Sequence, residues 1–192
     1  MSMRSLYRLA ALAGLLSGTC IILGKLLIPL SNPQPGEVFD FLSPFFALYF
    51  AVGLYLGQRK ESGILGLVSF VLMVAGLAAV LSLDYFGAFM RLQLPDGLTE
   101  QLMEGPSAPV FIASLLVFLV GELLFGISVI RAGVFSKVAA VLFMVGLFPV
   151  ALHPSGVFAE PVVVVSSVIA GVGLIWWGYE LNRFALALPS SV

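Results

Sequence analysis

Residues 110–130 of the chain read VFIASLLVFLVGELLFGISVI, an apolar stretch interrupted by a single charged residue, Glu122. About 20 mostly apolar residues in a helix cross the hydrocarbon core of a bilayer, because each adds about 1.5 Å to a thickness of about 30 Å. Backbone polar groups in lipid have to be satisfied within the segment. The stretch is therefore predicted to be a transmembrane helix.

Five further stretches have the same character. They are residues 9–30, 38–56, 64–83, 134–152 and 162–179. With 110–130 they predict one all-α domain over residues 1–192, a bundle of six transmembrane helices joined by short loops. The longest loop, residues 88–107, is expected on the outer side, and its segment Leu98–Met103 is predicted to form a short interfacial helix.

The composition agrees with a multi-pass membrane protein and excludes several other classes. The chain is 60% hydrophobic and 10% charged, whereas soluble domains are about 45–50% apolar and about 25% charged. Nine basic against ten acidic residues leave no cationic footprint for nucleic acid. A single cysteine, Cys20, and a single histidine, His153, are too few for a disulfide, a thiolate metal site or a bis-histidine haem. We therefore predict no metal and no resident cofactor.

The charges predict an orientation, since cytoplasmic loops of membrane proteins carry the excess of Lys and Arg. An N-terminus inside places seven cations in the cytoplasm: Arg4, Arg8, Arg59, Lys60, Arg131, Lys137 and Arg183. The same orientation places seven acids at the outer side: Glu37, Asp40, Asp84, Asp96, Glu100, Glu104 and Glu160. Both termini are then cytoplasmic, in a plasma membrane that we expect to be a bacterial inner membrane.

The outer acids have two interpretations. Asp40, Glu104 and Glu160 each lie beside an expected helix start with a proline nearby. Acids at helix N-termini are stabilised by the helix dipole, and proline is tolerated in the first turn. The alternative is that these acids capture a cation.

Lys25 and Glu122 are the charged residues expected inside spans, where an ionisable group is a functional candidate by default. Lys25 follows Gly14 and Gly18 on one helix face, and we expect it to find a partner in Asp84 or Asp40. The alternative is that its long side chain reaches the outer headgroups.

Glu122 is expected to share an interior polar stripe with Ser114 and Gly126, at spacings of eight and four. It then acts as a proton or cation relay, or anchors the polar group of a ligand. The alternative is a purely structural hydrogen bond to one of three serines on the packed helices: Ser69, Ser128 or Ser166.

His153 is a weaker candidate. With Asp84 and Glu160 it is expected to form a small polar cluster at the outer surface, and the alternative is an ordinary loop histidine. No phosphate loop, nucleophile elbow or HExxH motif is present in the sequence, so no catalytic residue is predicted.

Pairs of small residues four apart permit close helix contacts in lipid. They are Gly14 and Gly18, Gly53 and Gly57, Ala75 and Ala79, and Ser167 and Gly171. They are expected to build the bundle itself, and alternatively to bind other membrane subunits or a second copy of the chain.

Three functional classes remain open. The first is a non-catalytic accessory or structural subunit of a membrane assembly. The second is a small transporter or channel, or a protein that binds a lipid, quinone or carotenoid, using Glu122 and Lys25. The third is an outer-face lipid-modifying enzyme using Asp84, His153 and Glu160.

Overall fold

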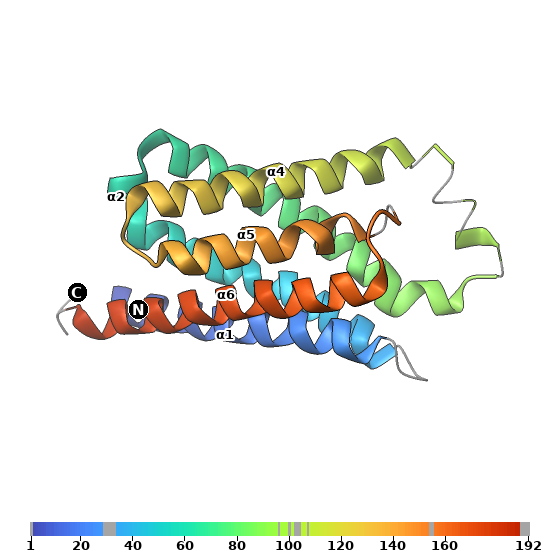
Figure 1. Ribbon diagram of the computed structural model, residues 1–192, viewed down its shortest axis with the longest axis horizontal. Helices are drawn as coiled ribbons and strands as arrows, with labels where there is room; N and C mark the ends of the chain where they lie inside the picture. The colour runs from blue at the N-terminus through green and yellow to red at the C-terminus, as the bar shows by residue number, and fades with distance from the viewer. Residues whose placement is uncertain are drawn as a thin grey trace.

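The computed structural model describes residues 2–28, 34–95, 97–99, 101, 105–106, 108–153 and 156–188. These residues form helices and connecting turns, with no strand among them, which confirms the all-α prediction (Figure 1). The α-helices are α1 (Met3–Leu27), α2 (Gln34–Tyr85), α4 (Ala108–Ala132), α5 (Lys137–Ala151) and α6 (Glu160–Ala187). A π-helical turn, η1 (Phe86–Met90), and a 3-10 turn, η2 (Arg91–Gln93), continue directly from α2.

The long element α2 folds back on itself at Gly63. This residue has φ +55° and ψ −145°, a conformation that glycine adopts without the steric cost of a Cβ. The rings of Tyr55 and Phe70 stack with centroids 4.5 Å apart, although fifteen residues separate them in the sequence. The first arm, residues 34–62, and the second arm, residues 64–85, therefore lie side by side in opposite directions.

The predicted count of six helices is not confirmed. Four helices in the described chain are long and apolar enough to cross a membrane: α1, α2 with its η1 extension, α4 and α6. The predicted spans 38–56 and 64–83 belong to one element, because the polar segment between them stays helical up to Gly63. In the predicted span 134–152, helix α5 has 15 residues and begins only after Ser136, whose hydroxyl caps it.

The predicted start of the outer loop, residues 88–107, is wrong. The chain remains helical through η1 and η2 as far as Gln93, so the loop is shorter than expected. Within the predicted interfacial helix Leu98–Met103, Leu98, Thr99 and Gln101 are helical, and the remaining positions lie outside the described residues. Asp96, Glu100 and Glu104 also lie outside them.

The helices pack into a bundle whose N- and C-termini lie at the same end (Figure 1). Helix α1 packs between α2 and α6, α5 packs on α6, and α4 packs on the second arm of α2. Small residues make the close approaches: a Cβ added to Gly18 would lie 2.6 Å from the Gly171 carbonyl, and one added to Gly14 would strike the Phe50 ring at a similar distance. The glycine faces of α1 and α6 are thus used within the chain.

Candidate functional site

A cavity of about 480 Å³ lies inside the bundle, with walls from α1, α2, η1, α4, α5 and α6. Its polar groups are strongly segregated. Aromatic side chains line much of the wall: Phe50, Phe111, Phe118, Phe125, Phe143 and Trp177. Six of the seven titratable lining residues come from the helix ends opposite the termini, namely Lys25, Glu37, Asp40, Asp84, Arg91 and His153, and the seventh is Glu122 inside α4. We call these six residues the charged end of the cavity.

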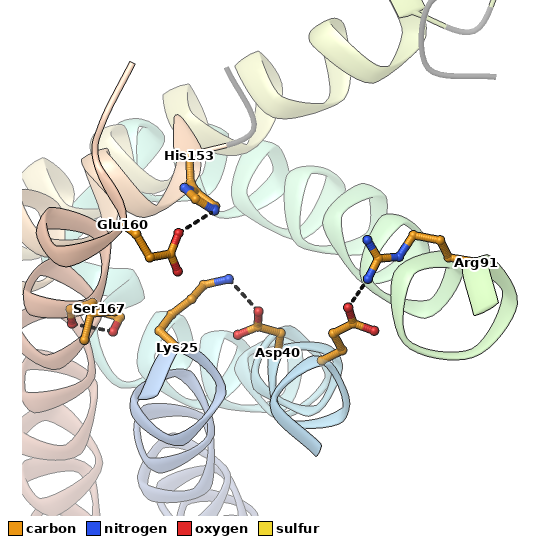
Figure 2. Close-up of polar contacts among 8 residues, drawn as sticks. Lys25, Asp40, Arg91, His153, Glu160 and Ser167 are labelled. Atoms are coloured by element: carbon orange, nitrogen blue, oxygen red, sulfur yellow. Dashed lines mark hydrogen bonds and ion pairs between the residues drawn. The ribbon is translucent and has the colours of Figure 1, made fainter. Parts of the chain in front are cut away.

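Lys25 and Asp40 form the most buried ion pair of the charged end. Lys25 Nζ lies 2.5 Å from Asp40 Oδ2, and the two side chains are 14% and 15% exposed (Figure 2). Gly24 lets the helices approach here, since a Cβ on it would collide with the Asp40 carboxylate. Of the partners expected for Lys25, the structure therefore selects Asp40 and not Asp84, and the ammonium points to the cavity rather than out to headgroups.

Two more ion pairs complete this end of the molecule (Figure 2). Arg91, from η2, donates to Glu37 in the first turn of α2. His153 Nε2, after the end of α5, lies 3.5 Å from Glu160 Oε2 at the start of α6. Lys25–Asp40 and His153–Glu160 each join consecutive helices, and Arg91–Glu37 joins residues 54 positions apart, so the three pairs tie the helix ends together at this end of the molecule.

The predicted outer cluster of His153, Asp84 and Glu160 is only partly assembled as expected. His153 pairs with Glu160, and Asp84 lines the same cavity as Lys25 and Asp40. The expected position of Asp40 beside a helix start is wrong. Helix α2 begins at Gln34, so Asp40 lies in its second turn and Pro44 lies inside the helix. Glu37 occupies the first turn of α2, and Glu160 occupies the first turn of α6.

Glu122 lies in the cavity wall and is 3% exposed. Its Oε2 atom has no hydrogen-bond partner among the described residues. The expected structural bonds to two of the serines are not formed, because the Ser69 hydroxyl donates to the Gly66 carbonyl (3.2 Å) and the Ser128 hydroxyl is itself unpartnered. This carboxyl is thus the one acid in the cavity wall that lies far from the charged end.

The expected stripe from Ser114 to Glu122 is wrong. The Ser114 hydroxyl donates to the Val110 carbonyl at 2.8 Å, and the residue lines a separate surface groove between α4 and α2. Eight residues at about 100° each rotate two side chains by about 80°, which turns Ser114 away from the cavity. Gly126 instead makes room for the Met144 side chain.

Two features of the site were not anticipated. The Arg91–Glu37 pair joins residues 54 positions apart, and no sequence pattern links them. Gln58 is fully buried with both amide atoms unpartnered, and it lies just beyond the predicted span 38–56. The sequence signal for Gln58 is a polar amide two residues past an apolar stretch, on a helix that continues to Gly63.

No protein-family model, curated protein or solved structure matches this chain. Within the described part of the chain, no three His, Cys, Asp or Glu residues are grouped so that they could hold a metal ion. The shape and the chemistry of the cavity are the features of the molecule that point to a function.

Proposed function

We propose that this protein binds a small amphiphilic molecule of the membrane inside its cavity. The observation that carries the proposal is the segregation of the lining, with ion pairs at one end and mostly aromatic and aliphatic side chains along the rest, where Ser17, Ser43 and Glu122 are the polar residues. Binding pockets for small molecules typically measure about 300–1,000 Å³, and a cavity of about 480 Å³ falls in that range. The polar group of the ligand would contact the charged end, and its apolar body would lie among the phenylalanines.

The charged end narrows the class of ligand. An apolar body that moves from lipid into this cavity exchanges one apolar environment for another, so its burial contributes little to affinity. The preference of the cavity for one membrane molecule over another then has to come from contacts with the head group of that molecule. Lys25 and Asp40 offer a donor and an acceptor side by side, which favours a lipid or a quinone over a carotenoid hydrocarbon without polar atoms.

We also propose that the chain crosses the membrane six times, with both termini in the cytoplasm of a bacterial cell. The two arms of α2 would be separate crossings, and α5 with its flanking residues a further one. Both termini lie at one end of the bundle (Figure 1). Arg4 lies in the first turn of α1, Arg131 in the last turn of α4 and Lys137 at the start of α5, and an excess of Lys and Arg at the cytoplasmic side supports this orientation. A reporter fused after Val192 should be cytoplasmic, and an extracytoplasmic reporter contradicts this orientation.

The binding proposal is tested by native mass spectrometry of the detergent-purified protein with added phosphatidylethanolamine or decylubiquinone. One adduct per chain should survive mild activation. Ala47→Phe, which fills the cavity, should abolish that adduct. Ala78→Phe adds the same bulk to the same helix at an exposed position and should leave it intact. If neither compound binds, or if Ala47→Phe retains the adduct, the proposal is wrong.

A second candidate function is that of an accessory subunit of a membrane assembly. The observation that favours it is the surface groove between α2 and α4, which is lined by small and aliphatic side chains including Ala75, Ala79, Pro109 and Ala113. Small residues of this kind permit a close approach by another helix in lipid. Partner subunits that co-purify with the wild-type chain and are lost with Ala79→Phe would support this role.

A further inference from the structure

A second group of buried polar side chains lies between the cavity and the end of the bundle that holds the termini. Gln58 and Ser128 are fully buried, and the Gln58 amide and the Ser128 hydroxyl have no hydrogen-bond partner in the described chain. The hydroxyl of Ser62 is also buried and unpartnered. A Cβ on Gly66 would lie 3.3 Å from Ser128 Oγ and closer still to Ser62 Oγ, so both hydroxyls lie close to that glycine. We call Gln58, Ser62 and Ser128 the inner polar layer.

The inner polar layer lies directly below the floor of the cavity. Leu54, Met73 and Phe125 line the cavity. Gln58 follows Leu54 by four residues, and Ser128 follows Phe125 by three, in each case toward the end of the bundle that holds the termini. One helical turn is about 5.4 Å. A single apolar layer thus separates the cavity from the inner polar layer.

Glu122 lies in the cavity wall at the level of that floor. Gly121 packs against the backbone of Leu72 and Met73, which places Glu122 at their level on the second arm of α2. Asp84 is eleven residues beyond Met73, about 17 Å along the helix at 1.5 Å per residue. The carboxyl of Glu122 is therefore midway along the bundle, between the charged end and the inner polar layer.

Unpartnered polar groups in this position call for an explanation. Each one left without a hydrogen bond costs about 1–3 kcal/mol, and aliphatic residues would pack the bundle without that loss. Buried polar sites of sufficient size hold water molecules that supply the missing bonds. Ionisable residues inside membrane bundles mark ion and proton pathways, and Glu122 is flanked by polar regions on both sides.

We propose that the cavity, Glu122 and the inner polar layer together form a proton pathway through the bundle. A proton enters from the charged end and binds the Glu122 carboxylate, giving the neutral acid. It crosses the floor when the Leu54, Met73 and Phe125 side chains move apart, and the carboxylate is restored. Water held by Gln58, Ser128 and Ser62 carries the proton to the turn at Gly63. This activity goes beyond amphiphile binding and does not depend on it.

The test is proton flux into proteoliposomes that contain the pH dye pyranine, driven by a potassium gradient and valinomycin. Wild-type protein should change the internal pH at least ten times faster than protein-free vesicles. Glu122→Gln keeps the shape of the side chain and removes its proton exchange, so flux should fall to the protein-free level. Glu122→Asp keeps a carboxyl and should retain measurable flux.

The inner polar layer is tested with a matched pair of serines on α4. Ser128→Ala should reduce flux several-fold, and so should Gln58→Leu. Ser114→Ala removes a hydroxyl that donates to its own helix outside the cavity, and it should leave flux unchanged. Each variant is first shown to be monodisperse with a melting temperature close to that of the wild type, so that a loss of flux reports the pathway.

Flux through wild-type vesicles equal to that of protein-free vesicles overturns the proposal. Wild-type flux through Glu122→Gln overturns it as well, and so does equal flux through Ser128→Ala and Ser114→Ala. The adduct measured by mass spectrometry is a separate readout. Flux without an adduct leaves the proton pathway standing and refutes amphiphile binding, and an adduct without flux does the reverse.

Discussion

The charged end of the cavity and the interior of the bundle treat polar side chains in opposite ways. At the charged end Lys25 pairs with Asp40, and Arg91 pairs with Glu37. In the interior, Glu122, Gln58 and Ser128 each keep at least one polar atom without a partner in the described chain. The ion pairs therefore compensate most of the charges at the charged end, although Glu37 Oε2 and His153 Nδ1 are also buried without a partner in the described chain, whereas no ion pair compensates the interior groups. Breaking an ion pair at the charged end should therefore lower stability, whereas removing an unpartnered polar atom from the interior should not.

The largest effect expected is the loss of stability when one partner of the buried ion pair is removed. Lys25→Met leaves the Asp40 carboxylate without its cation in a site where both side chains are about 15% exposed. Breaking a buried pair in this way costs about 3–5 kcal/mol, because the remaining charge is uncompensated. Denaturant unfolding in detergent micelles measures the free energy of unfolding for the variant and the wild type.

The double variant Lys25→Met/Asp40→Leu is the control for that prediction. Replacing both partners by apolar residues of similar size leaves no uncompensated charge, so most of the lost stability should return. If the double variant is as unstable as Lys25→Met, the loss comes from packing of the lysine side chain and not from its charge.

In the interior, removal of a polar side chain is expected to raise the free energy of unfolding rather than lower it. Glu122→Leu removes a buried carboxyl oxygen that has no hydrogen-bond partner in the described chain, and stability should rise by about 1–3 kcal/mol. The same unfolding measurement detects it, with Glu122→Gln as the variant that keeps the polar atoms. A loss of stability in Glu122→Leu would mean that the carboxyl makes a stabilising bond after all, and the contrast between the two regions would disappear.

The positions of the helices were largely predictable from the apolar stretches, because a helix satisfies its own backbone hydrogen bonds and these cannot be left unmade in a bilayer. The predicted spans from 9–30 to 162–179 all lie largely within helices of the structure. Gly63 was not predictable in the same way. A polar segment of seven residues, 57–63, was expected to be a loop, but a single glycine with positive φ reverses the chain and the segment before it remains helical.

The site was predictable only as single residues. Lys25 and Glu122 stand out because charge inside a span is costly, and both line the cavity. Which residues meet is a matter of helix rotation and register, which an apolar sequence specifies poorly. Asp40 and Asp84 were equally good partners for Lys25 by depth, and Ser114 was placed on the face of Glu122 by a spacing that drifts by about 80°.

Two serines sharpen the comparison at a smaller scale. Ser167 and Ser128 are both fully buried, but the Ser167 hydroxyl donates to the Val164 carbonyl at 2.7 Å and the Ser128 hydroxyl has no partner among the residues that the structure describes. Ser167→Ala should lower the free energy of unfolding by about 1 kcal/mol, the net contribution of one hydrogen bond. Ser128→Ala should leave it unchanged or raise it. Equal losses in the two variants would show that burial of the hydroxyl, and not its bonding, decides the effect.

The smallest effect is expected at the rim of the charged end. His153 and Glu160 are 37% and 43% exposed, more than twice the values for Lys25 and Asp40. Exposed ion pairs contribute about 0–1 kcal/mol, because water screens the charges and ordering the side chains offsets the attraction. Glu160→Gln should therefore change the free energy of unfolding by less than about 1 kcal/mol, and added salt should reduce even that. If Glu160→Gln loses as much free energy of unfolding as Lys25→Met, the contribution of an ion pair does not depend on how deeply it is buried.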